Sequence, residues 1–532
     1  MKILYNATLF APDFPGATAL ALAHGQIVAV GTDVEILDAF PLAEEKLNLN
    51  GLTLWPGLTD AHVHLKYLAE SRAIVNCETA TRAECLARIE AAAQQLPVGA
   101  WIRGHGWNHN QWPEGLGTAA LLDQVSHGHP AYLSAKSLHI GWSNNKALAL
   151  AGLSDSSPDP EGGILQRDQE GHLTGILFEA EAVDLVLDVI PESTKDTLKN
   201  QIQALIPELL QVGLVGVHDF DGMDCWLALQ ELQQENKLNF HVRKGIPFDH
   251  LDAFIGAGLR SDYGDDTLQV GSVKLFSDGA LGSQTAAMLA PFEGTNNTGA
   301  LLLSEDEIFE IGKKTSQNGL SLAIHAIGDR ANRVVLNAYT KLRDFEQEQR
   351  LPHFQHRIEH VQILSPEDLP RLAELDIVAS VQPVHAPSDM DMADHFLGKR
   401  AALSYAYRSL KATGAEMVFG SDAPVEPVNP FHGLHAAVTR CRLDGSPGSD
   451  GWYPQERLSL ADALDGFSSA PARIANRGTR QGRIIPGAKA DLILLKDDPF
   501  TLDSHEIGAI QPLATMINQD WVYLHPDLSI GV

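Results

Sequence analysis

The feature that most constrains the fold is a regular alternation of short apolar runs with longer amphipathic segments through the middle of the chain. The apolar runs have the length of β-strands, and the amphipathic segments space their apolar residues as helices do. Because parallel strands are joined by crossovers that are usually helical, this alternation predicts a parallel sheet. At this chain length, the leading prediction is a (β/α)8 TIM-like barrel. The strand-like runs lie at residues 213–218, 270–276, 320–325, 354–360, 377–382 and 416–421, and the helix-like segments at 305–317, 331–345 and 367–375.

Both ends of the chain are rich in strand-like runs separated by turn signals, the clearest being Leu492–Leu495. Since the two termini of a domain often lie close together, we predict that residues 1–55 and 480–532 form one small β-sandwich. Residues 56–479 would then form the barrel. Within them, residues 67–193 are too many for one strand–helix unit, so we predict an inserted subdomain there, after the first barrel strand.

The charge balance limits the kinds of partner that the chain can have. The formal net charge is −29, from 39 basic and 68 acidic residues, which argues against nucleic acid or an anionic membrane as a partner. A small-molecule substrate remains, and a homo-oligomer is left open. The 4 cysteines form no CxxC pair, and neither a signal peptide nor a long apolar run is evident. We therefore expect a cytoplasmic location.

The segment Asp60-Ala61-His62-Val63-His64 carries the first chemical signal. Side chains two residues apart on a strand point to the same side, so His62 and His64 would present two imidazoles on one face. Two such nitrogens are half of a divalent-metal site. In a chain with 22 histidines, however, the pair alone is equally compatible with ordinary surface or core histidines.

Further metal-competent residues recur at the ends of later strand-like runs. Lys274, His325, His360 and Asp422 each stand where a barrel strand is expected to end. In such barrels, catalytic groups cluster at the C-terminal ends of the strands. Four histidines and one carboxylate form a nitrogen and oxygen ligand set suited to zinc or a similar divalent ion.

At this point the chain resembles the amidohydrolase superfamily, in particular the branch similar to N-substituted formamide deformylases (amidohydrolase family 3). The resemblance covers nearly the whole chain, and the ordered set of motifs is far more specific than any one of them. The matching strings are PGLTDAHVH at 56–64, VKLF at 273–276, DGALGS at 278–283, IHAIGDRA at 324–331, RIEH at 357–360 and GSDAP at 420–424.

The resemblance implies a centre with two divalent ions, expected to be zinc. It implies that Asp422 contacts the first ion and acts as general base, and that Lys274 lies between the ions. Because a protonated ammonium has no lone pair, Lys274 would have to become a carbamate in order to bridge them. The implied ligands are His62 and His64 for the first ion and His325 and His360 for the second.

Substrate contacts are less sharply indicated. The stretch 101–112 is rich in aromatic and amide side chains, which suit a small-molecule pocket, and Trp107 and Asn108 are its candidates. His139 is a candidate for a catalytic contact, at even odds with a structural role. Further candidate substrate contacts are Glu179, Arg330, Gln382 and His385.

The chemistry of such a centre predicts an enzyme that hydrolyses a carbon–nitrogen bond. A bound divalent ion supplies hydroxide near neutral pH, so the leading hypothesis is a metal-dependent amidohydrolase acting on a small N-acyl or N-formyl compound. One alternative is a deaminase with a single metal ion and a heterocyclic substrate. Another is a catalytically silent binding protein on the same scaffold, although all the expected ligands are present.

Overall fold

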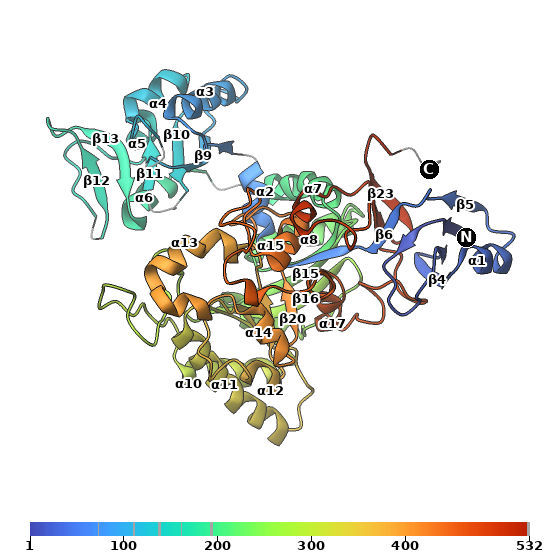
Figure 1. Ribbon diagram of the computed structural model, residues 1–532. Coiled ribbons are helices and arrows are strands. Elements are labelled where there is room, and N and C mark those ends of the chain that lie inside the picture. The colour runs from blue at the N-terminus through green and yellow to red at the C-terminus, as the bar shows by residue number, and fades with distance from the viewer. Residues whose placement is uncertain (73, 110–111, 137–139, 161, 192–194, 529–532) are drawn as a thin grey trace. The chain divides into compact units, whose positions relative to one another are not determined.

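The computed structural model describes residues 1–72, 74–109, 112–136, 140–160, 162–191 and 195–528. The chain divides into two compact units, one made of Met1–Lys66 and Ile202–Val532 and the other of Tyr67–Gln201. In Figure 1, Met1–Lys66 is blue and Ile202–Val532 runs from green to red. Among the described residues, no helix is both long enough and apolar enough to span a membrane.

The larger unit contains a (β/α)8 barrel, as the alternating pattern predicts. Eight parallel strands form one sheet in the order β20-β19-β18-β17-β16-β15-β14-β7. A parallel bridge from Val63 to Ala423 joins the first strand to the segment after the last, which closes the sheet. The strands are β7 (Leu58–Val63), β14 (Leu214–Asp219), β15 (His241–Pro247), β16 (Leu268–Phe276), β17 (Leu322–Ala326), β18 (Arg357–His360), β19 (Val378–Val381) and β20 (Met417–Phe419).

Helices follow the barrel strands, and local signals account for their ends. Helix α10 (Glu305–Gln317) begins after Ser304, whose side chain forms a capping box with Glu307. The predicted helix at 367–375 is reduced to the single turn α12 (Arg371–Glu374), because Pro370 disfavours a helical residue before it. The other helices of this unit include α8 (Met223–Gln234), α9 (Leu251–Gly256), α11 (Asp329–Glu348), α13 (His385–Leu397), α14 (Tyr407–Ala412), α15 (Pro430–Thr439), α16 (Leu460–Phe467) and α17 (Ser469–Ile474).

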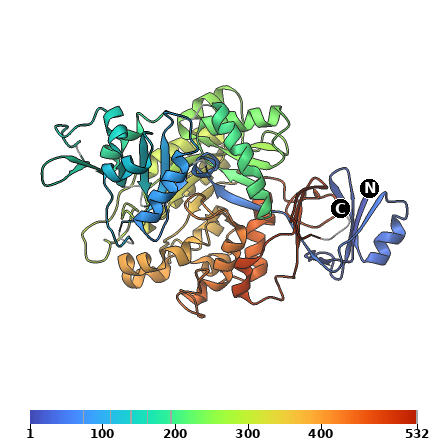
Figure 2. The same cartoon turned by 90° about the horizontal axis from the view of Figure 1, so that it is seen from above.

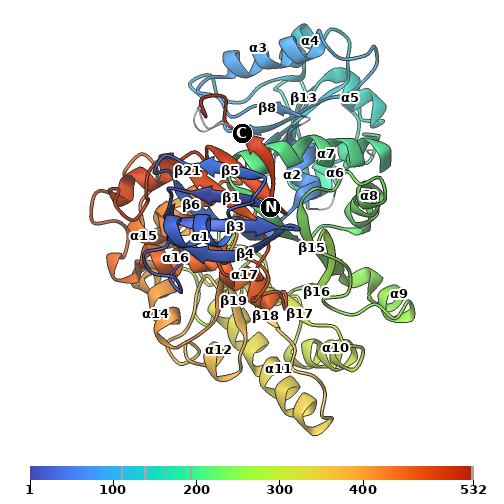
Figure 3. The same ribbon diagram turned by 90° about the vertical axis from the view of Figure 1, so that its right-hand side faces the viewer.

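The two ends of the chain build a pair of sheets in the same unit. Leu4 and Leu22 from the N-terminal end and Leu494 and Met516 from the C-terminal end belong to one buried apolar cluster. Strand β6 pairs with β21, which places blue and red strands side by side in Figures 2 and 3. One sheet is β4 (Gln26–Gly31), β3 (Ala19–Ala23), β1 (Lys2–Tyr5) and β5 (Glu45–Asn48); the other is β2 (Thr8–Leu9), β6 (Thr53–Pro56), β21 (Leu492–Leu495), β22 (Ala514–Ile517) and β23 (Asp520–Leu524).

The smaller unit is built on a sheet of its own, which the sequence patterns did not reveal. Its strand order is β12-β13-β11-β10-β9-β8, and Trp107, Trp112 and Trp142 pack together in its core. The strands are β8 (Val75–Asn76), β9 (Ile102–Trp107), β10 (Ala131–Ala135), β11 (Ile140–Ser143), β12 (Ile164–Arg167) and β13 (Leu173–Phe178), and its helices include α3 (Arg82–Ala93), α4 (Ala119–Val125), α5 (Asn145–Leu150) and α6 (Ala180–Leu187).

Candidate metal centre

The C-terminal ends of the barrel strands bring together histidines that lie far apart in the sequence. The rings of His325 and His360 are 4.5 Å apart between centroids, and those of His62 and His360 are 5.1 Å apart. Asp422, just after β20, places Oδ1 3.4 Å from Nε2 of His62 and 3.4 Å from Nε2 of His64. Five residues from four strand ends therefore converge on one place, as catalytic groups in such barrels do.

Each of the four histidines has one ring nitrogen held by a hydrogen-bond acceptor. His62 Nδ1 lies 2.5 Å from Glu359 Oε2, and His64 Nδ1 lies 2.9 Å from Asp221 Oδ1. His325 Nε2 donates to the carbonyl of Gly279 at 3.0 Å, and His360 Nδ1 lies 2.9 Å from Gln382 Oε1. A neutral imidazole that donates from one nitrogen keeps a lone pair on the other, which is the arrangement of metal-ligating histidines.

A buried nitrogen without a partner supports the same interpretation. Within the described part of the chain, His62 Nε2 is buried and has no hydrogen-bond partner. An unsatisfied buried polar atom costs about 1–3 kcal/mol, so its presence calls for a ligand that the protein itself does not provide. His62, His64 and Asp422 form one group whose ligand atoms lie within 4.8 Å of one another, and His360, His385 and Asp422 form a second. The donor set thus fits a divalent metal ion.

The electrostatics of the site favour neutral rings at His62 and His325 and a charged Asp422. Burial and the charge of Lys274 together lower the pKa of His62 to about 4 and that of His325 to about 4. At His64, burial lowers the pKa, but the hydrogen bonds to Asp221 and Asp422 outweigh it and raise the pKa to about 10. Burial raises the pKa of Asp422, but the neighbouring histidines outweigh it and hold that pKa well below its usual range. Neutral imidazoles and a carboxylate are the forms that bind metal.

The backbone at two of these residues is strained. His360 has φ +75° and Asp422 has φ +59°, a region that non-glycine residues rarely adopt. Such conformations cost about 1–3 kcal/mol each and persist where surrounding structure enforces them, commonly at active sites. His360 is the last residue of β18, and Asp422 follows the end of β20, so both strained residues lie where the candidate ligands converge.

Lys274 lies in β16 and is buried with its amine among aromatic rings. Its Nζ is 4.8 Å from the centroid of Phe220 and 4.9 Å from that of Phe276. Burial lowers the pKa of Lys274 to about 8, against the opposing charges of Glu359 and Asp422. The amine is thus held in a place where its charge is poorly solvated.

Several residues around the centre escaped the sequence analysis. Glu359, which holds His62, is paired with Arg357, whose Nη2 donates to Glu359 Oε2 at 2.9 Å. The RIEH string contained both residues, but nothing in its spacing distinguished the glutamate from the strand's other buried residues. Asp60 accepts the N–H of Ser421 at 3.0 Å and so ties the first strand to the last. Burial raises the pKa of Asp60 to about 7.

Asp221 and its neighbours form a second support that no motif indicated. Besides holding His64, Asp221 accepts the backbone N–H of Lys66 at 2.5 Å. Asp219 accepts the N–H of Leu65 at 2.7 Å and forms a fully buried ion pair with Lys244 at 3.0 Å. These carboxylates fix both the backbone and the ring at the end of the first strand.

The residues predicted to contact substrate lie in different parts of the structure. Gln382 holds His360, His385 lies beside it, and Arg330 is exposed at the start of α11. Trp107, Asn108 and Glu179 belong to the smaller unit, where Trp107 is fully buried and donates its indole N–H to the Leu133 carbonyl at 2.9 Å. That contact indicates packing of Trp107 within its own unit. His139 lies outside the described residues.

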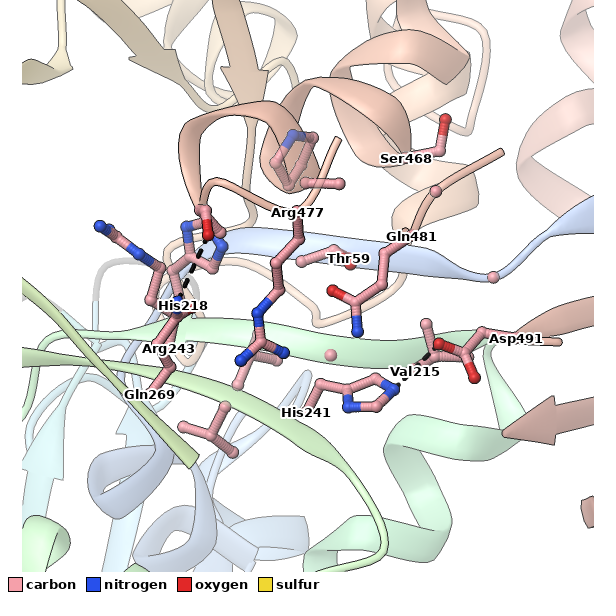
Figure 4. Close-up of a pocket in the computed structure, with 18 residues that line it drawn as sticks. Thr59, Val215, His218, His241, Arg243, Gln269, Ser468, Arg477, Gln481 and Asp491 are labelled. Carbon is pink, nitrogen blue, oxygen red and sulfur yellow. Dashed lines mark hydrogen bonds and ion pairs between the residues drawn. The ribbon is translucent and has the colours of Figure 1, made fainter. Parts of the chain in front are cut away.

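A separate cavity of about 40 Å³ lies at the other end of the barrel, where the strands begin (Figure 4). His241 at the start of β15 has Nε2 3.0 Å from Asp491 Oδ2 and Nδ1 2.5 Å from the carbonyl of Asp266. Arg477 donates to the carbonyls of Asp265 and Asp266. His241 and Arg477 are thus engaged with neighbouring acceptors, whereas Nε of Arg243 and Nε2 of Gln481 have no hydrogen-bond partner in the described chain.

The closed barrel with a nitrogen and oxygen donor set at its strand ends defines the class: a metal-dependent hydrolase. Residues 45–523 match the family model described as the amidohydrolase family. The chain belongs to this family and is a hydrolase acting on carbon–nitrogen bonds.

Similar proteins support the assignment over the whole length. The chain is 30% identical over 542 residues to "Protein LONG AFTER FAR-RED 3" of Arabidopsis thaliana, covering 98% of this chain and 91% of that protein. It is 29% identical to the "N-substituted formamide deformylase" of Arthrobacter pascens, covering 94% of each. A crystal structure described as an uncharacterized metal-dependent hydrolase from Pyrococcus furiosus matches with TM-score 0.78 and 27% identity, covering 94% of this chain and 100% of that one.

Proposed function

We propose that the enzyme hydrolyses the amide bond of a small N-acyl or N-formyl compound at a centre of two zinc ions. Two observations carry the proposal. Each of the four histidines has one ring nitrogen against an acceptor. The potential ligand atoms of His62, His64 and Asp422 lie within 4.8 Å of one another. A relative that covers 94% of the chain is named an N-substituted formamide deformylase, which favours an amide substrate.

Residues of this chain would hold both proposed ions. His62 and His64 would offer Nε2 and Asp422 its carboxylate to the first ion. His325 would offer Nδ1 and His360 Nε2 to the second, since their other nitrogens are engaged. We also propose that the neutral Lys274 amine would combine with CO2, releasing a proton, to give a carbamate, which would add an anionic oxygen ligand to the centre.

The ions and the protein side chains would have different roles in the reaction. Bound divalent ions lower the pKa of a water from 15.7 to about 7 and polarise the substrate carbonyl. Asp422 accepts the proton of the attacking water at its carboxylate and passes it to the leaving nitrogen. Glu359, Asp221 and Gln382 keep the histidine rings in orientation during both steps.

A substrate panel tests this proposal. The purified enzyme, loaded with zinc, is assayed with N-formyl amines, N-acetyl amines and heterocyclic amines, and the released acid, amine or ammonia is measured. We expect release of formate or acetate together with the free amine. Release of ammonia from heterocycles alone would favour a deaminase, and no turnover by the metal-loaded enzyme would favour a binding protein; either result overturns the proposal.

Other expectations from the sequence stay predictions. They are a cytoplasmic location, the absence of nucleic-acid and membrane partners, and an oligomeric state that includes a homo-oligomer.

A further inference from the structure

His385 is a fifth histidine at the centre. The sequence suggests it only as a candidate substrate contact, and the proposed ligand set does not use it. It begins α13, which follows the end of β19, and its exposed fraction is 6%. Its ring lies parallel to that of His360, at an interplanar angle of 6° and a centroid distance of 6.3 Å. The potential ligand atoms of His360, His385 and Asp422 all lie within 4.8 Å of one another.

The hydrogen bonding of His385 has the opposite polarity to that of the other four histidines. Their outer nitrogens face acceptors, whereas His385 Nδ1 lies 3.4 Å from Nε2 of Gln362, which is an amide donor. A neutral imidazole that accepts at Nδ1 carries its hydrogen on Nε2. His385 therefore presents an N–H where the others present a lone pair.

That N–H has nothing to bind within the described chain. His385 Nε2 is buried and has no hydrogen-bond partner among the described residues. A buried donor without an acceptor costs about 1–3 kcal/mol, and this one lies beside the groups proposed to hold the metal. A substrate oxygen at the centre would supply the missing acceptor.

We propose that the His385 Nε2–H donates a hydrogen bond to the carbonyl oxygen of the substrate and stabilises the negative charge that develops there during hydrolysis. The proposal rests on the proposed function, and it deepens that function by requiring a substrate with an oxygen at the reacting carbon. Donors fixed where charge develops are worth about 10²–10³ in kcat. The neutral N–H is prepared by Gln362, which makes Gln362 a positioning residue.

The competing role for His385 is that of a further metal ligand. A ligand would need its lone pair on Nε2 and hence a hydrogen on Nδ1, facing an acceptor. The two roles predict different outcomes for metal content, so they can be separated without relying on activity.

The experiment compares His385→Leu, His385→Asn and Gln362→Glu with the native enzyme, measuring zinc per chain, kcat and KM. Gln362→Glu replaces the donor by an acceptor, which moves the His385 hydrogen to Nδ1. We expect His385→Leu and Gln362→Glu to keep the native zinc content and KM while kcat falls about 10²–10³-fold. His385→Asn, which retains an N–H donor, is expected to recover part of kcat. Gln317→Glu, at an exposed position on α10, is the matched control.

Two results would overturn the assignment. Loss of zinc in His385→Leu would make the residue a ligand, and an unchanged kcat in a zinc-loaded, folded His385→Leu would remove it from catalysis. If the native enzyme cleaves no amide, the proposed function fails by itself. The zinc measurement is still decisive in that case, because loss of zinc contradicts a donor role and full retention supports it.

Discussion

The two ends of the barrel use histidine in opposite ways. Where the strands end, His62, His64, His325 and His360 each have one ring nitrogen against an acceptor, and we propose that the other binds a metal ion. Where the strands begin, His241 has both nitrogens against acceptors, the Asp491 carboxylate and the Asp266 carbonyl. The same side chain thus offers a lone pair at one end and is fully engaged at the other.

This difference separates groups that act from groups that hold the fold together. Residues at the C-terminal ends of barrel strands are typically catalytic, and those at the N-terminal ends typically contribute to stability. The cavity at the N-terminal end has room for water, which would serve the buried Nε of Arg243 and Nε2 of Gln481, two donors without partners in the described chain. We therefore expect changes at the two ends to affect different measurements.

The largest effect is expected from His360→Asn at the C-terminal end. This change removes a proposed ligand nitrogen, so kcat/KM should fall by more than about 100-fold, beyond what loss of an outer partner costs. Zinc per chain should fall as well, measured on the same preparation. His353→Asn is the control, because His353 is an exposed histidine that pairs with Asp376 at 2.7 Å. Native zinc content and activity in His360→Asn would contradict the assignment.

A smaller effect is expected from Asp221→Asn, which weakens the support of a ligand without removing it. The loss of charge behind His64 should reduce zinc affinity about 10–100-fold, as seen when the outer partner of a metal-bound histidine is changed. Competition with a chelator measures this affinity. Asp224→Asn provides the control, since Asp224 is half exposed and pairs with Lys66 at 2.5 Å. Equal affinities in both variants would show that Asp221 does not position His64.

Substitutions at the end of the barrel where the strands begin should change the stability of the protein and leave its activity unchanged. In the folded protein, burial lowers the pKa of His241, but Asp491 and the Asp266 carbonyl outweigh it and raise the net pKa. A raised pKa contributes stability that is fully present below the unfolded value of about 6.5 and is lost as pH rises through the folded value. Asp491→Asn should therefore destabilise the protein by about 1–3 kcal/mol near pH 6, and by less at higher pH.

Urea unfolding of native enzyme and Asp491→Asn at about pH 6 and about pH 9 measures this difference. Activity per folded molecule should be unchanged. Asp520→Asn, at an exposed position that begins β23, serves as the control. The difference in unfolding free energy between the native enzyme and Asp491→Asn should shrink as pH rises. A difference that grows with pH would contradict the stabilising role of the His241–Asp491 pair.

The sequence predicted the barrel well because its strands are buried on both faces and read as apolar runs. Strand β15 escaped prediction because Arg243 and Lys244 interrupt its apolar run, and both are buried by pairing with Asp262 and Asp219. Their burial depends on partners from distant segments, which no local pattern reveals. The six-stranded sheet of the smaller unit also escaped prediction, and two of its strands, β8 and β12, have only two and four residues.

At the candidate centre, too, the sequence predicted some residues and missed others. The residues with metal-binding chemistry, such as His325 and Asp422, stood out because each ended a predicted strand. Their supports did not, since Glu359 and Asp221 meet their histidines across 297 and 157 residues of sequence. Gln382 holds His360, and the expectation that it contacts substrate stays a prediction.

The most direct test of the central claim is the number of zinc ions bound per chain, measured by elemental analysis of the native enzyme and of Lys274→Ala. The account predicts two ions in the native enzyme, and in Lys274→Ala fewer ions together with loss of amide hydrolysis. A native count of one, unchanged in an active Lys274→Ala, would contradict the two-ion centre, and a native count of zero would contradict a metal centre at this end of the barrel.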